Sequence, residues 1–305
     1  MRQAQQKQRP EERKTGVLDI GSLPFSLKHT LISGQAFRWR KEGTSFVGVV
    51  SGNVLALEQR GERVVFNSSP GDTGPGELRR YLGLDAAYEE ALRSLPDDPV
   101  LQLAIRRFQG MRVLRQDPWE TLISFIISSN NSIIRIKRCI ESLCRSLGQE
   151  IQGAPGFYSF PAPDLLATAS LKCLKETCNL GYRHVYVKES ARRIARDSDL
   201  LTRIALLPYR IAKEKLIAEF PGVGPKVADC VLLYSMGKYE AFPIDTWIKK
   251  VMENAYFDGQ PVRDSAIRLF AADYFGPFAG YAQLYLFQYA ISGGADSLPE
   301  DAPSG

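Results

Sequence analysis

The sequence predicts an α+β protein in which an N-terminal antiparallel β-sheet domain is followed by a mostly helical bundle. Three short runs rich in β-branched residues, FVGVV, VLALEQ and RVVF, are separated by the turn segments SGN and RGE. Short polar turns between such runs are typical of antiparallel hairpins. From residue 113 onward the apolar residues instead recur at helical spacing, in one segment after another.

The length and composition are those of an ordinary globular protein with more than one domain. The chain has 305 residues, 44% of them hydrophobic, and a net charge of +5. This mildly basic balance permits nucleic-acid binding without requiring it. We expect a disordered tail at 1–15, a β domain at 16–112, a helical domain at 113–291 and a disordered acidic tail at 292–305.

Other features exclude several classes of protein. No window of about 18 apolar residues is present, so we expect no membrane contact, and the polar N-terminal stretch does not resemble a secretory signal. The five cysteines include no CxxC pair, which favours a reduced, intracellular protein. With only two histidines, a zinc site is not expected.

The start of the helical part is marked by a cap. In DPWETLISFIISS, Asp117 occupies the cap position, Pro118 the first helical position, and Glu120 lies three residues after the cap. Before it, LRRYLGL and AYEEALRSL already have helical spacing. After Asn130 and Asn131, a second amphipathic helix is expected to place Lys137, Arg138 and Arg145 opposite its apolar face, which is formed by Ile133, Ile136, Ile140, Leu143 and Leu147.

The remaining helices follow a proline-rich connection, PGFYSFPAPD. We expect them at 163–170, 171–177, 184–197, 209–219, 226–237, 245–254 and 261–275, with AGYAQLYLFQYAI as a closing core helix.

The segment 212–238 has the pattern of a helix–hairpin–helix module. AKEKLIAEF must stop at Pro221, the turn PGVG allows close backbone approach, and VADCVLLYSMG resumes helical spacing. The free amides at the start of the second helix suit a phosphate group. A plain turn between two helices, without a ligand, is the alternative.

Lys226 lies at the start of that second helix. The positive end of the helix dipole disfavours an ammonium, so the position suits a lysine that acts as a neutral nucleophile and forms a Schiff base. A phosphate-binding or simply solvated lysine is the alternative.

Asp245 follows nineteen residues later, in AFPIDTW. It can cap the next helix, and it can also offer a carboxylate to positive charge that develops on a sugar. The two roles are compatible.

Together these segments resemble the helix–hairpin–helix (HhH-GPD) DNA glycosylases, and within them the 8-oxoguanine DNA glycosylases of the eukaryotic-like branch. The resemblance rests on LIAEFPGVGPKVADCVLLYS and AFPIDTW, joined by SGQAFRWR, DPWETLISFIISSNNSIIRI, LGYRHVYV and GYAQLYLFQYA. It implies a bifunctional base excision repair enzyme that removes 8-oxoguanine opposite cytosine through a lysine Schiff base. The enzyme would then nick the strand by β-elimination, acting on a base flipped out of the duplex.

The resemblance also implies roles for individual residues. Lys226 matches the nucleophilic lysine and Asp245 the catalytic aspartate. Gly222, Val223 and Gly224 match the hairpin that holds the DNA backbone.

For the damaged base, Gly34 matches a glycine whose carbonyl accepts a hydrogen bond from N7–H, where undamaged guanine has an acceptor. Gln283 matches the residue that reads the Watson–Crick edge. Phe287 and Cys230 match the two walls that enclose the base.

For the opposite strand, Asn130, Arg135 and Arg183 match residues that hold cytosine, and Tyr182 matches the aromatic wedge. Trp247 stands where animal and fungal members have a phosphate-binding histidine, which puts that contact in doubt.

The expected partner is double-stranded DNA that contains oxidised guanine, bound by a monomer associated with DNA in the nucleoid or nucleus. No cofactor or metal is expected. A glycosylase for another base is one alternative, although no cysteine follows Cys230 to form the four-cysteine iron–sulfur loop of thymine-glycol and adenine enzymes. A non-catalytic DNA-binding module is the other, and it would need neither Lys226 nor Asp245.

Overall fold

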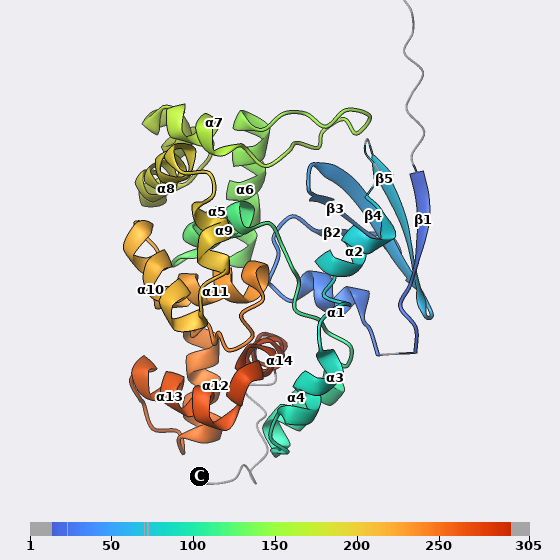
Figure 1. The fold of residues 1–305 in the computed structure, drawn as a ribbon, viewed down its shortest axis with the longest axis vertical. Helices are drawn as coiled ribbons and strands as arrows, with labels where there is room; N and C mark the ends of the chain where they lie inside the picture. Colours follow the sequence, from blue (N-terminus) through green and yellow to red (C-terminus); the bar gives the residue numbers. More distant parts are fainter. Residues whose placement is uncertain (1–13, 23, 70, 72, 294–305) are drawn as a thin grey trace, which may run out of the picture.

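The computed structural model describes residues 14–293, apart from 23, 70 and 72, as a β-sheet beside a larger group of helices (Figure 1). The expected disorder of residues 1–13 and 294–305 lies outside the described residues. Residues 14 and 15, which were expected in the N-terminal tail, instead belong to the first strand, because that strand begins at Lys14. The strands are β1 Lys14–Asp19, β2 Arg40–Glu42, β3 Ser45–Val50, β4 Asn53–Arg60 and β5 Arg63–Ser69.

These strands form one antiparallel sheet in the order β1-β5-β4-β3-β2. The predicted hairpins are confirmed. Val50 pairs with Asn53 around a two-residue turn, in which Ser51 has φ 50° and Gly52 has φ 77°. Two successive positive φ values are those of the tight turn that matches strand twist.

One face of the sheet is covered by helices α1 (Leu27–Ile32) and α2 (Pro75–Tyr81). Leu55 and Leu57 of β4 are fully buried at alternating positions, as expected for a half-covered strand. On β3, Val49 packs against Ile151 and Ala154 of the connection that reaches over from the helical part (Figure 1).

In the helical part, the predicted helices are present with small shifts at their ends. Its helices are α3 Tyr88–Ser94, α4 Pro99–Arg107, α5 Pro118–Ser128, α6 Ile133–Leu147, α7 Pro163–Thr168, η1 Cys173–Thr177, η2 Gly181–Arg183, α8 His184–Arg196, α9 Leu200–Ala205, α10 Tyr209–Glu219, α11 Pro225–Met236, α12 Thr246–Tyr256, α13 Asp264–Tyr274, η3 Gly276–Phe278 and α14 Ala279–Ile291. Of these, α4 and α9 were not predicted. None of the helices in the described part of the chain is long and apolar enough to cross a membrane.

Helices α3 and α4 lie against α14, almost two hundred residues later in the chain (Figure 1). The hydroxyls of Tyr88 and Tyr285 are 2.9 Å apart, and both rings belong to the hydrophobic core of the helices. The segment before residue 112 therefore contributes to both cores, and the domain division at that residue stays a prediction.

Helices α10 and α11 are joined by a buried polar cluster. The Asp229 carboxylate, fully buried, accepts hydrogen bonds from the Tyr209 hydroxyl at 2.7 Å and from Lys213 Nζ at 2.7 Å. Burial raises the pKa of Asp229 and lowers that of Lys213, which opposes ionisation, whereas their mutual attraction favours it. This cluster fixes the angle between the two helices that flank the PGVG turn.

We expect Lys213→Met to lower the free energy of unfolding by about 3 kcal/mol, because it leaves the Asp229 carboxylate buried without its charge partner. Urea denaturation measures the change. Lys215→Met on the same helix is the matched control, since the Lys215 side chain is 48% exposed and its pair with Glu219 contributes under about 1 kcal/mol. Equal losses in the two variants would contradict the assignment.

Candidate functional site

A cleft of about 1020 Å³ opens where α5, α11, α12 and α14 meet the segment after α1. Its walls include predicted site residues from stretches far apart in the sequence: Gly34, Asn130, Arg135, Lys226, Cys230, Asp245, Gln283 and Phe287. The remaining predicted site residues, on the hairpin and in η2, do not line the cleft.

The turn between α10 and α11 depends on one glycine conformation. Gly222 has φ +80°, and a Cβ built there would lie 2.6 Å from the Tyr186 ring. Val223 is buried, whereas a Cβ built on Gly224 would meet no atom within 4 Å. The turn thus packs inward at Gly222 and Val223 and leaves open space beside the Gly224 backbone.

Lys226 occupies the second position of α11, after Pro225. Its Nζ donates a hydrogen bond to Ser128 Oγ at 3.1 Å and lies 5.2 Å from the centre of the Phe125 ring. Both partners belong to α5, so the amine is held at the junction of two helices and faces the cleft.

Asp245 is the cap of α12, as the sequence allows. Its Oδ1 accepts the backbone N–H of Ile248 at 2.8 Å. Burial raises the pKa of Asp245, and the Ile248 amide and the Lys226 charge partly oppose that rise. A carboxylate and an amine therefore share one partly desolvated cleft, an arrangement suited to nucleophilic attack with stabilisation of positive charge.

Gly34, Phe287 and Cys230 line the same cleft. Gly34 has φ +84°, and a Cβ there would lie 3.1 Å from the Phe287 ring, so the chain passes close to that ring only because the residue is glycine. Burial raises the pKa of the Cys230 thiol to about 12, and Lys226 partly opposes the shift. The thiol is therefore neutral and serves as an apolar surface near pH 7.

Gln283 is 3% exposed and oriented by two contacts. Its Oε1 accepts from the Tyr234 hydroxyl at 3.2 Å, and its Nε2 donates to the Pro243 carbonyl at 3.1 Å. An amide has two donor hydrogens and two acceptor lone pairs, so one of each remains for a ligand in the cleft.

The turn after α5 is held by Arg183. The guanidinium, 6% exposed, donates to the Ser129 carbonyl through Nε at 2.8 Å and to the Asn130 carbonyl through Nη2 at 2.8 Å. Asn130 has φ +49°, a left-handed conformation that asparagine tolerates better than most residues. The Tyr182 ring, 53% exposed, lies 4.4 Å from the guanidinium carbon and faces solvent beside this turn. Arg135, on the first turn of α6, is exposed.

Trp247 also lines the cleft, with 44% of its surface exposed, two residues after Asp245. An indole has no acceptor and one donor, so it offers an apolar face where a histidine would offer two polar ring nitrogens.

Sequence reasoning missed Ser128, Phe125 and Tyr234, which contact Lys226 or Gln283. Inside apolar helical runs these residues are indistinguishable from core residues. The one available signal was Ser128, a polar residue at the end of α5, directly before the Ser129–Asn130 turn.

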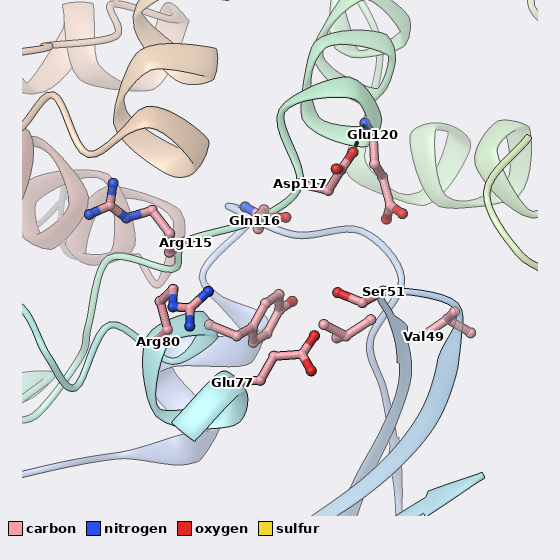
Figure 2. Close-up of a pocket in the computed structure, with 10 residues that line it drawn as sticks. Val49, Ser51, Glu77, Arg80, Arg115, Gln116, Asp117 and Glu120 are labelled. Carbon is pink, nitrogen blue, oxygen red and sulfur yellow. Dashed lines mark hydrogen bonds between the residues drawn. The ribbon is translucent and has the colours of Figure 1, made fainter. Parts of the chain in front are cut away.

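A second cavity, of about 230 Å³, lies at the junction of the sheet with the helices (Figure 2). Figure 2 shows Glu77 and Arg80 on α2 facing Asp117 and Glu120 at the start of α5. It contains none of the predicted site residues. Among the described residues, no group of three or more histidine, cysteine, aspartate or glutamate side chains is arranged to hold a metal ion.

Two family models match consecutive parts of the chain. Residues 17–122 match the 8-oxoguanine DNA glycosylase N-terminal domain, and residues 123–270 match the HhH-GPD superfamily base excision DNA repair protein model.

Relatives match over nearly the whole length. The "Probable N-glycosylase/DNA lyase" of Methanothermobacter thermautotrophicus is 34% identical over 88% of this chain and 95% of its own. The N-glycosylase/DNA lyase of Saccharomyces cerevisiae is 30% identical over 93% of this chain and 88% of its own. A crystal structure of Clostridium acetobutylicum 8-oxoguanine glycosylase/lyase, in complex with double-stranded DNA containing cytosine opposite 8-oxoguanine, is 36% identical. It superposes with a TM-score of 0.84, covering 92% of this chain and 97% of that one.

The hairpin geometry predicts that substitution lowers the stability of the protein at one of its two glycines but not at the other. Gly222→Ala should lower the free energy of unfolding by about 2 kcal/mol, because it strains a left-handed backbone and clashes with Tyr186. Gly224→Ala, in extended backbone with open space, should stay within about 1 kcal/mol of the parent. Urea denaturation compares them. A Gly222 variant as stable as the Gly224 variant would show that the turn is not constrained as described.

Proposed function

The chain belongs to the 8-oxoguanine DNA glycosylases of the HhH-GPD superfamily, and from that premise we propose that Lys226 and Asp245 excise 8-oxoguanine opposite cytosine and then cleave the strand. The substrate is double-stranded DNA that carries the oxidised base. We propose that the protein works on the cell's own DNA, in the nucleoid or the nucleus.

One observation carries the residue-level proposal. Lys226, from the hairpin, and Asp245, from the next helix, face a single cleft that also contains Gly34, Gln283 and Phe287. A phosphate-binding hairpin alone would not require a carboxylate, or a cleft large enough to admit a base, beside its lysine.

The chemistry follows from the two charged groups. The neutral amine of Lys226 forms a bond to C1′ as the bond from C1′ to the base breaks, and the base leaves with the electron pair. Asp245 stabilises the positive charge that develops on the sugar. The sugar ring then opens to give a Schiff base at Nζ, and loss of a C2′ proton expels the phosphate at C3′, which nicks the strand.

The walls of the cleft suit recognition of the lesion. Guanine presents an acceptor at N7, whereas 8-oxoguanine carries a hydrogen there, so the Gly34 carbonyl attracts one and repels the other. The free donor and acceptor of Gln283 then contact the Watson–Crick edge, while Phe287 and the neutral Cys230 thiol enclose the ring. The open space beside Gly224 accommodates the sugar–phosphate backbone, together with the adjoining Gly222 and Val223 turn.

The opposite strand meets the turn after α5. Asn130, Arg135 and Arg183 supply donors that match the O2 and N3 acceptors of an unpaired cytosine. The exposed ring of Tyr182 fills the space left by the flipped nucleotide.

Sodium borohydride should trap a covalent adduct between this protein and duplex DNA that contains 8-oxoguanine opposite cytosine, because reduction fixes the Schiff base. Lys226→Gln should form no adduct while it still binds the duplex. Denaturing gel electrophoresis measures trapping. An undiminished adduct in Lys226→Gln would remove this lysine from the mechanism.

Asp245→Asn should bind lesion DNA normally but release the base about 100-fold to 1,000-fold more slowly, as expected for loss of transition-state charge stabilisation. Single-turnover kinetics measure the rate. Because burial raises the pKa of Asp245, the active carboxylate is lost as pH falls through that raised value. As pH falls, the wild-type rate of base release should therefore decline at a higher pH than the ordinary pKa of an aspartate predicts. An unchanged rate of base release in Asp245→Asn would disprove the charge role.

Arg135→Ala should reduce the preference for cytosine over adenine opposite the lesion by about tenfold, the effect of one lost base contact. Excision rates on the two duplexes measure it. Arg138→Ala, three residues later on the same helix, is the matched control and should keep the preference. Equal preferences in both variants would show that Arg135 does not contact the opposite base.

A further inference from the structure

The amine of Lys226 already has a fixed partner in the free protein. Nζ lies 3.1 Å from Ser128 Oγ, and Ser128 is only 8% exposed. Ser128 ends α5 and lines the same cleft as Lys226 and Asp245. The contact therefore joins the helix that starts after the hairpin to the end of a different helix.

The direction of this hydrogen bond is set by a second contact. Ser128 Oγ lies 2.7 Å from the Phe125 carbonyl, which can only accept. The one hydroxyl hydrogen of Ser128 is thus directed to its own helix, and a lone pair of Oγ faces the amine. Ser128 accepts from Lys226 and does not donate to it.

This direction matters for a nucleophile. A hydroxyl that donated to a neutral amine would occupy the lone pair needed for attack. An oxygen that accepts an N–H instead fixes the position of the nitrogen and leaves that lone pair free. The Phe125 ring, 5.2 Å from Nζ, limits the amine on another side.

We propose that Ser128 is a positioning residue that holds the Lys226 amine for attack with its lone pair unoccupied. The proposal rests on the function argued above, because it concerns the nucleophile of that reaction. The alternative is a serine hydroxyl that bonds only to its own helix, as serines near helix ends often do. Such a hydroxyl would have no second partner, whereas Ser128 Oγ also accepts from Lys226 Nζ.

The decisive variant is Ser128→Ala, compared with Ser235→Ala. Ser235 is 6% exposed, and its hydroxyl donates to the Val231 carbonyl of α11 at 2.6 Å, so its removal deletes an equivalent bond away from the cleft. Borohydride trapping on the lesion duplex should be about tenfold slower in Ser128→Ala, the effect of one lost hydrogen bond, with DNA affinity unchanged. Ser235→Ala should trap at the parent rate.

A second measurement needs no DNA. In the free protein, Lys226 of Ser128→Ala should undergo reductive methylation about threefold to tenfold faster than in the parent, because its amine has lost the Ser128 oxygen as a fixed partner. Peptide mass spectrometry measures the rate, which is normalised to that of the exposed Lys215. Unchanged methylation, trapping at the parent rate, or a loss of DNA affinity that parallels the loss of trapping would each overturn the positioning role. If the wild type forms no adduct, the proposed function fails, while methylation still decides whether Ser128 holds the amine.

Discussion

The location of the Lys226 amine depends on the turn between α10 and α11. That turn is possible because Gly222 adopts a left-handed conformation against the Tyr186 ring, and the neighbouring Val223 is buried. Pro225 then starts α11 without losing a hydrogen bond, since the first amides of a helix have no partner within it. The Asp229 cluster holds the two helices at a constant angle. The backbone of Lys226 is therefore placed before any ligand arrives, and the Ser128 oxygen then holds the amine.

Around that amine, the cleft is assembled from separate helices, each of which contributes one kind of chemistry. The start of α12 provides a carboxylate, α14 an amide with a free donor and acceptor, and the segment after α1 the backbone of Gly34. Their mutual positions depend on the packing of α5, α11 and α14, each of which contributes eight or more buried residues. A change in that packing would move several groups of the cleft together.

Much of this could be predicted from the sequence, because the informative segments are either periodic or carry a turn signal. The hairpins of the sheet, the Asp117 cap and the closing helix are confirmed. The short helices α1, α4 and α9 were missed, since fewer than three turns give little periodicity. Lys137 was expected on the solvent side, but its amine donates to the Trp39 carbonyl, a contact between distant segments. For the site, resemblance supplied the residues, whereas the partners of Lys226 and Gln283 required three-dimensional packing.

The engagement of Arg183 has a consequence for how the opposite base is sensed. Its guanidinium donates to the Ser129 and Asn130 carbonyls in the free protein, so a base that binds Arg183, as we propose, competes with these two carbonyls. Cytosine offers two adjacent acceptors in return, whereas the pairing edge of adenine offers one acceptor beside a donor. In the proposed role of Arg183, recognition of the opposite base is thus a competition between the carbonyls of its own loop and the acceptors of the base. On this proposal, a poorly matched nucleotide leaves Arg183 hydrogen-bonded to its own loop, and the contacts of the free protein contribute to selectivity.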